Sequence, residues 1–395
     1  MVASLPAGIR AGPRWEERCQ RTRGHNVGFT SVENPAADQT DAQRSTRRAA
    51  IWGGVPLAVM ALMLMLGGIP GTPVKLTVPY AAESAGPTFN TLAEVEGTPV
   101  IEIEGGEVDE TSGSLDMTTV SVRTNMTMGQ AIGRWLFSND TLVPIGQILP
   151  KDMTDEEMRK HNEASFVASE AAATVAAMKH LGEPTKVIVH DVLPDTAAAD
   201  ALKPDDTITA IDGEEVTEPQ QIQDKVRAKK PGDDVTVTFI RGDGDKQDTT
   251  ITLGENPEDK EQPLLGVTMT SEPAGDINVT YNLNDVGGPS AGMIFSLAVI
   301  DKLSPGELNG GRNVAGTGTI REDGTVGPIG GITHKIEGAR DGGAELFLAP
   351  EKNCAEARKV DSGDMVVAKV STLDDAISAM HDFSTGQEVQ TCEAE

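Results

Sequence analysis

An apolar stretch without a single charged residue, Ala49 to Ile69, divides this 395-residue chain into a basic N-terminal part and an acidic remainder. A helix needs about 20 apolar residues to cross a bilayer, so we predict a transmembrane anchor over residues 49–70. Arginines precede it at Arg10, Arg14, Arg18, Arg21, Arg23, Arg44, Arg47 and Arg48. After it, Lys75 is the only basic residue before Arg123. Because positive flanks stay inside the cell, we expect a cytoplasmic N-terminus and an extracytoplasmic remainder, held at the cell membrane.

A cleaved signal peptide is the alternative for this stretch, since both begin with basic residues and continue with apolar ones. The apolar core of a signal peptide is only about 7–15 residues long, which favours an uncleaved anchor. Residues 1–48 are rich in Arg, Ala, Gly, Thr and Gln and show no sustained apolar period. We therefore expect a disordered cytoplasmic tail there.

The formal net charge of −28 argues against a nucleic-acid partner, because phosphate contacts need clustered Lys and Arg. Of the cysteines, Cys19 falls in the predicted tail, whereas Cys354 and Cys392 fall in the external part. An oxidising compartment would allow these two to form a disulfide, which would tie down an acidic tail over residues 384–395. Two unpaired thiols are the alternative.

The region after the anchor, residues 77–182, predicts an extracytoplasmic β-containing segment followed by a linking helix. Two runs alternate like strands: Val100 to Glu104 and Thr118 to Arg123. Thr154 and Glu157 form a capping box at the start of the helix, and Gly182 marks its end. We expect this helix to connect one domain to the next.

Short strand-like runs separated by turn residues fill residues 183–255 and predict a small β-rich domain. The expected strands are Val187 to Val192, Thr207 to Ile211, Val235 to Ile240 and Thr249 to Leu253, and the expected helices are Ala197 to Leu202 and Pro219 to Ala228. The run VLPDTAAADALKPDDTITAIDGEEV resembles a PDZ domain of the bacterial type, which implies capture of an extended peptide at a sheet edge. The usual Lys-x-Gly-Asp turn stands here as Lys203 to Asp206, without its glycine. We expect the carboxylate-binding loop around Leu181 to Val187; a spacer that binds nothing is the alternative.

Two glycine-rich motifs, GGPSAG at Gly287 to Gly292 and PIGGITHK at Pro328 to Lys335, fall within residues 263–383. A serine hydroxyl becomes a nucleophile when a base takes its proton, and a lysine can be that base only when burial lowers its pKa. Ser290, at a strand-to-helix turn, and Lys335 are the candidates for this pair. Each motif alone has a simpler explanation: the serine could merely turn the chain and cap a helix, and the lysine could open a helix at the surface.

Together, PSAG and PIGGxxxK resemble the proteolytic domain of Lon-type proteases, over Leu264 to Met380. Gly316-Thr317-Gly318 and the run Glu345 to Asn353 extend the resemblance. It implies an α+β domain with serine endopeptidase activity, in which Ser290 is the nucleophile and Lys335 the base. It also implies that Thr317 hydrogen-bonds the lysine, that backbone N–H groups near Ser290 form an oxyanion hole, and that copies of the chain self-associate.

The predicted fold is thus multidomain: an N-terminal transmembrane helix, a small β-rich PDZ-like domain over residues 183–255 and an α+β proteolytic domain over residues 263–383. This arrangement resembles the membrane-bound, PDZ-containing Lon-like proteins of Gram-positive bacteria. The sequence departs from Lon at Thr319, where Lon usually has an acidic residue, and it has no G-x-x-x-x-G-K-[ST] motif to hold phosphates. We therefore expect no ATP requirement, no other cofactor, and polypeptide substrates that are unfolded, extended or already cleaved.

Other interpretations stay open at this point. A GxSxG motif followed by His381 also fits the Ser, Asp, His order of α/β-hydrolases. That fold needs several strands of one long sheet before its serine, whereas here the PDZ-like domain and its linker end only about thirty residues upstream. A phosphate-binding glycine loop of small-molecule kinases is a further alternative, which the lysine motif disfavours. The chain could also be a catalytically silent, membrane-tethered PDZ scaffold.

Overall fold

The computed structural model describes residues 52–393 except 57, 69–71, 73, 96, 139, 149–152, 154, 258 and 284–285. The chain divides into two compact units, Met1–Met63 and Leu64–Glu395. The tail predicted over residues 1–48 and the predicted capping residue Thr154 lie outside the described residues.

Part of the predicted anchor, residues 49–70, falls among the described residues. Residues 52–56 and 58–65 are helical. Of the helices that the structure describes, none combines the length and the apolar character needed to cross a bilayer. The anchor therefore stays a prediction.

The larger unit contains a mixed sheet with the strand order β20-β19-β16-β5-β1-β6. Its strands are β1 (Tyr80–Asn90), β5 (Ser114–Arg123), β6 (Thr141–Pro144), β16 (Asn313–Gly316), β19 (Leu346–Pro350) and β20 (Val366–Val370). The strand β16 is parallel to β5 and β19, and its Ala315 pairs with Asp116 on one side and Phe347 on the other. The sheet thus joins strands from residues 77–182 to strands from residues 263–383, two regions that the sequence-based boundaries separate.

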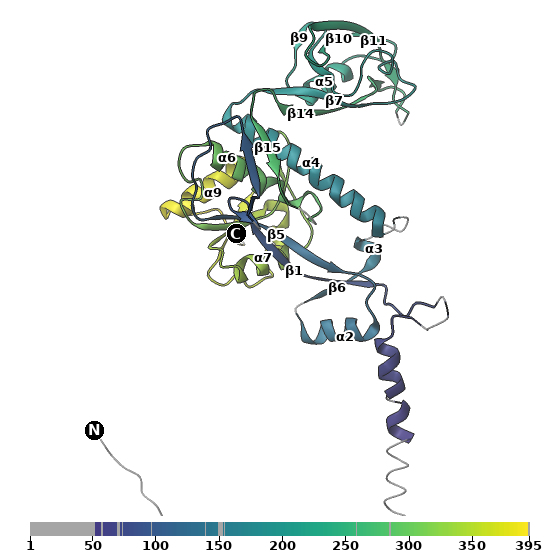
Figure 1. Cartoon of the computed structure of the whole chain (residues 1–395), viewed down its shortest axis with the longest axis vertical. Coiled ribbons are helices and arrows are strands. Elements are labelled where there is room, and N and C mark those ends of the chain that lie inside the picture. Colours follow the sequence, from purple (N-terminus) through teal and green to yellow (C-terminus); the bar gives the residue numbers. More distant parts are fainter. Residues whose placement is uncertain are drawn as a thin grey trace, which may run out of the picture. The chain divides into compact units, whose positions relative to one another are not determined.

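Helices pack on both faces of this sheet (Figure 1). Successive side chains of a strand point to opposite faces, so Val314 and Leu348 contact one helical layer while Ala315 and Phe347 contact the other. The helix that follows Ser290 is buried from Gly292 to Asp301. The first layer consists of α4 (Asp155–Leu181), α6 (Gly292–Leu303) and α9 (Leu373–Thr385), and the second of α7 (Ile332–Asp341) and α8 (Cys354–Ala357).

Shorter elements complete this part of the unit. The short strands pair as β2 (Glu94–Val95) with β3 (Thr98–Pro99), β4 (Ile101–Glu104) with β15 (Asn278–Tyr281), and β17 (Thr319–Ile320) with β18 (Val326–Gly327). The short helices are α2 (Met128–Phe137), α3 (Ile145–Ile148), η1 (Pro289–Ala291) and η2 (Glu351–Asn353).

A second sheet has the order β11-β10-β8-β7-β14 and forms the small β-rich module labelled with α5 in Figure 1. Its elements are β7 (Thr185–Val192), β8 (Thr207–Ile211), β9 (Glu214–Glu215), α5 (Pro219–Arg227), β10 (Asp234–Ile240), β11 (Lys246–Thr252), β12 (Gly254–Glu255), β13 (Pro263–Leu264) and β14 (Val267–Pro273). The strands and the second helix predicted for this region are confirmed. The helix predicted over Ala197 to Leu202 is wrong: the segment forms turns, since few residues lie between the left-handed Asp195 and Pro204 to repay helix nucleation.

The missing glycine of the PDZ-like turn is replaced by an aspartate in the conformation that glycine favours. Asp205 has φ 71°. Next to it, Asp206 accepts the Lys203 backbone N–H at 2.8 Å and pairs with Arg241 at 2.7 Å. The turn is therefore kept without its glycine.

The sheet edge at which this module could accept a peptide is not next to the binding loop expected around Leu181 to Val187. Both sides of β7 are occupied, by β8 and by β14. In the described part of the chain, β14 is the edge strand of this sheet that contacts α5. A binding loop around Leu181 to Val187 is thus wrong for a peptide that adds as a strand, because the open edge begins after Gly266, beyond β13.

Candidate active site

The loop that carries Ser290 is held by the long helix α4. The Gly288 N–H donates to the Asn162 carbonyl at 2.9 Å, and Ser169 Oγ donates to the Pro289 carbonyl at 3.1 Å. The sequence predicted α4 only as a link between domains, because backbone acceptors leave no residue signature. Helix α4 is therefore a structural support of the serine loop.

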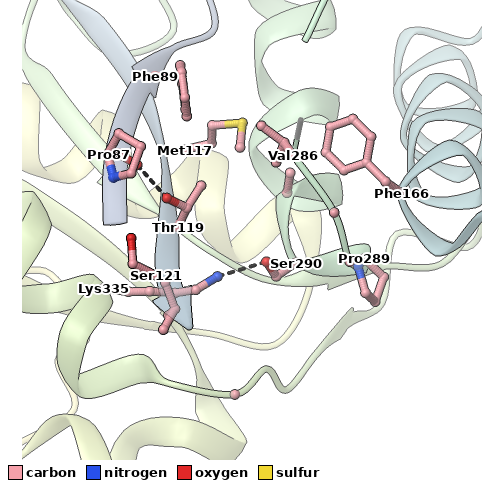
Figure 2. A pocket seen from close by; sticks show the side chains of 15 residues that line it. Pro87, Phe89, Met117, Thr119, Ser121, Phe166, Val286, Pro289, Ser290 and Lys335 are labelled. Atoms are coloured by element: carbon pink, nitrogen blue, oxygen red, sulfur yellow. Dashed lines mark hydrogen bonds between the residues drawn. The ribbon is translucent and has the colours of Figure 1, made fainter. Parts of the chain in front are cut away.

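Lys335 lies in the first turns of α7, on the opposite helical layer. Gly331 precedes that helix with φ 69°, and a Cβ there would lie 2.7 Å from Val120 Cγ2, so a glycine is required. The lysine is only 3% exposed. Its Nζ donates to Ser290 Oγ at 2.7 Å (Figure 2) and to Thr317 Oγ1 at 2.9 Å.

Thr317, which directly follows β16, sets the direction of these hydrogen bonds. It is fully buried, and its Oγ1 donates to the Ser290 carbonyl at 3.0 Å. Because a hydroxyl has one proton, Thr317 Oγ1 must accept from Lys335 Nζ. The Gly318 N–H donates to the same Ser290 carbonyl at 2.9 Å. The structure thus brings together Ser290, Lys335 and Thr317, the three residues singled out in the sequence.

Burial lowers the pKa of Lys335 from 10.5 to about 7. Among the described residues, no carboxylate forms an ion pair with it that would oppose this shift. A substantial fraction of Lys335 is therefore neutral near pH 7 and able to accept a proton.

A cavity of about 550 Å³ lies beside Ser290 and Lys335 (Figure 2). Much of its wall is apolar, contributed by Phe89, Met117, Phe166 and Val286. Of the residues described around it, Lys335 is the only charged one. The cavity therefore suits an apolar side chain next to the serine hydroxyl.

The structure separates the alternative base from the site. His381 is an exposed residue of α9 whose backbone carbonyl accepts from Ser384 Oγ at 2.9 Å, and no hydrogen bond between described residues joins its ring to Ser290. Lys335 occupies the position that a histidine would need. In the described ranges, no cluster of His, Cys, Asp and Glu could hold a metal ion.

Cys354 and Cys392 form a disulfide, with their Cα atoms 4.9 Å apart. The C-terminal segment also pairs with β20: the Cys392 N–H donates to the Val367 carbonyl at 3.0 Å, and the Lys369 N–H donates to the Gln390 carbonyl at 2.8 Å. The disulfide thus fixes Cys392, near the end of the predicted acidic tail, at the sheet edge.

Two segments match known domain families. Residues 157–253 match the PDZ domain, and residues 278–381 match the Lon protease (S16) C-terminal proteolytic domain. The chain therefore carries a PDZ domain and a proteolytic domain of the Lon type, which is that of a serine endopeptidase.

Individual relatives are similar over part of their length. Lon protease 2 of Herpetosiphon aurantiacus is 31% identical over 37% of this chain and 20% of its own length, and the Lon protease of Phenylobacterium zucineum is 31% identical over 32% and 16%. The chain thus spans about a fifth or less of the curated relatives that it matches. Among solved structures, the PDZ domain of an SdrC-like protein from Listeria monocytogenes is 33% identical, covers 21% of this chain and 85% of its own, and has a TM-score of 0.20.

Proposed function

We propose that this chain is a membrane-anchored, ATP-independent serine endopeptidase, in which Ser290 and Lys335 act on unfolded or extended polypeptides outside the cytoplasm. The observation that carries the proposal is the 2.7 Å contact between Lys335 Nζ and Ser290 Oγ, at a site where burial brings the pKa of the lysine to about 7. A general base must lie within hydrogen-bond reach and have a pKa near the working pH.

The reaction would proceed by acyl transfer. Neutral Lys335 takes the Ser290 proton while Oγ attacks the peptide carbonyl, and the resulting ammonium then protonates the leaving amine. A water molecule, deprotonated by the same lysine, releases the acyl group and restores the serine. The N-terminal end of α6 and nearby backbone N–H groups would stabilise the oxyanion, because a helix dipole is positive at that end.

The PDZ domain would bind the polypeptide substrate. A peptide could add as a strand to β14, the open edge beside α5. The chain continues from β14 through β15 to Ser290, so the bound peptide would be held by the segment that leads to the nucleophile. Self-association of copies, as the resemblance to Lon implies, is part of the same proposal.

The combination of the proposed anchor with a PDZ domain and a Lon-type domain supports kinship with the PDZ-containing Lon-like proteins of Gram-positive bacteria. Two features support the extracytoplasmic location. The arginine-flanked apolar segment over residues 49–70 would anchor the chain with its N-terminus inside. The pairing of Cys354 with Cys392 suits an oxidising compartment. ATP independence rests on the lack of a phosphate-binding loop motif in this sequence.

The test is cleavage of unfolded casein by the full chain in detergent, with and without ATP. We expect Ser290→Ala and Lys335→Ala to abolish cleavage, while His381→Ala, the matched control, and omission of ATP leave it unchanged. If the unsubstituted chain is inert and identical to Ser290→Ala, the silent PDZ scaffold becomes the better interpretation. Loss of activity in Ser290→Ala and His381→Ala, with Lys335→Ala still active, would support the Ser-His-Asp alternative instead.

A further inference from the structure

Helix α2 presents an apolar face that nothing in the described part of the chain covers. Its side chains Met128, Ile132, Trp135 and Leu136 are 46%, 41%, 67% and 55% exposed. The spacing i, i+4, i+7, i+8 places them on one side of the helix. Soluble monomers rarely expose such a contiguous apolar patch, so we expect this face to be an interaction surface.

The helix itself is well formed and fixed to the unit that contains the active site. Thr127 and Gln130 make a reciprocal capping box, with N–H to side-chain distances of 3.2 and 3.0 Å. On its inner side, Ala131 is buried in a small apolar cluster with Val78 and Met126. The outward apolar face is therefore a stable feature, not the result of fraying.

The position of α2 beside the apolar segment indicates what kind of partner would cover this face. A Cβ at Gly129 would lie 2.9 Å from the Leu64 carbonyl oxygen, so the first turn of α2 adjoins the last part of the apolar segment. The Val78 N–H donates to the Met126 carbonyl at 2.9 Å, which holds the start of α2 against the chain that follows the segment. Where that segment leaves a bilayer, α2 would be at the same depth.

The composition of this part also suits a lipid surface. Residues 124–139 contain no Asp or Glu, in a chain that has 61 of them. The one basic residue of the helix, Arg134, pairs with Asp140 at its C-terminal end. Tryptophan is enriched where membrane meets water, and Trp135 is the most exposed of the four side chains of this face.

We propose that α2 lies in the membrane–water interface, with its exposed apolar face between the lipid headgroups and the start of the acyl chains. The proteolytic domain is then attached to the membrane by the anchor and by this second contact. The inference rests on the anchor proposed above, but it concerns a different segment and can fail separately.

The test places a single tryptophan in the full chain, reconstituted into phosphatidylcholine vesicles with or without brominated acyl chains. In the variant Trp15→Phe, Trp52→Phe, we expect brominated lipid to quench Trp135 emission by about twofold or more, as for an interfacial side chain. Adding Ile132→Glu and Leu136→Glu should remove this quenching. The matched control carries Val167→Trp, a 61% exposed site on α4, with all native tryptophans changed to Phe, and should not be quenched.

A third chain that retains only Trp52 reports the anchor. Quenching of Trp52 without quenching of Trp135 would overturn the inference while leaving the anchor intact, and quenching of neither would remove both. A blue-shifted Trp135 that bromine does not quench would show that protein covers the face, which contradicts a lipid partner. Equal quenching of Val167→Trp would contradict it as well, because adsorption would then be unspecific.

Discussion

Ser169 and Pro289 are 120 residues apart in the chain, yet Ser169 Oγ donates a 3.1 Å hydrogen bond to the Pro289 carbonyl, one residue ahead of Ser290. This contact ties the nucleophile loop to a helix that precedes the whole PDZ module. The geometry of Ser290 therefore depends on residues outside the glycine-rich motifs.

Ser169→Ala should lower kcat with little change in KM. One hydrogen bond is worth about 1 kcal/mol, so the expected loss is about three- to tenfold. Steady-state cleavage of a fluorogenic peptide measures it. Ser165→Ala, one helical turn away on α4, is the control and should keep full activity; equal losses in both variants would argue that α4 acts only through general stability.

Lys335→Arg should be as inactive as Lys335→Ala, because a guanidinium stays protonated and cannot take the Ser290 proton. We expect the rate to fall about 10³-fold or more, as when a member of a catalytic pair is removed. Casein cleavage measures turnover, and phosphonylation by a serine-directed fluorophosphonate, with loss of fluoride, measures the reactivity of the Ser290 hydroxyl. Substantial activity in Lys335→Arg would show that another group is the base.

Thr317→Val should slow catalysis by removing the acceptor for Lys335 Nζ and the donor to the Ser290 carbonyl. Each lost buried hydrogen bond costs about 1–3 kcal/mol, which predicts a drop in kcat of about tenfold or more. Thr317→Ser keeps the hydroxyl and should recover most of the rate. A Thr317→Ser variant as slow as Thr317→Val would point to packing of the methyl group instead.

The pKa of Lys335 gives two pH-dependent results. Activity should rise with pH through about 7, because only the neutral amine accepts the serine proton. The free energy of unfolding should also rise with pH. Between pH 7 and 10.5 the unfolded chain binds more protons at Lys335 than the folded chain does, so a higher pH favours the folded state. The free-energy cost of burying the charged Lys335 ammonium is fully present below pH 7 and disappears as the pH approaches 10.5.

Lys335→Met should therefore raise Tm, and by more at pH 6 than at pH 9. Full removal of the penalty corresponds to several kcal/mol, about 1.4 for each pKa unit. Thermal unfolding followed by circular dichroism at both pH values measures this. An equal Tm change at the two values would contradict a lysine with a lowered pKa.

The apolar cavity predicts substrate preference. Peptides with Leu or Phe on the acyl side of the scissile bond should be cleaved about 10- to 100-fold faster than those with Asp, since the apolar walls of the cavity would desolvate a carboxylate without donating hydrogen bonds to it. Phe89→Ala should reduce kcat/KM for Phe more than for Ala at that position. A peptide-library digest analysed by mass spectrometry gives both comparisons.

Much of the β-rich module and the reactive pair could be predicted from sequence. Thr207–Ile211 forms a strand at the predicted residues, because strand alternation and turn residues are local signals. Ser290 and Lys335 were found through glycine-rich motifs, which fix both backbone shape and residue type. The contact between Asn162 and Gly288 could not be found, because a backbone carbonyl has no residue preference. The shared sheet was missed for a similar reason: parallel pairing of Asp116 with Ala315 links strands about 200 positions apart.

The PDZ module enters and leaves the rest of the unit through β7 and β14, which are paired down to Thr185 with Pro273 and closed by the Ala274 N–H to the Pro184 carbonyl at 2.8 Å. A domain joined by a single linker can rotate freely, whereas two connecting strands that are hydrogen-bonded to each other permit bending but resist rotation. A polypeptide captured on β14 would thus stay within a restricted radius of Ser290, at a high effective concentration. Weak capture would then suffice for repeated cuts in one chain before it escapes.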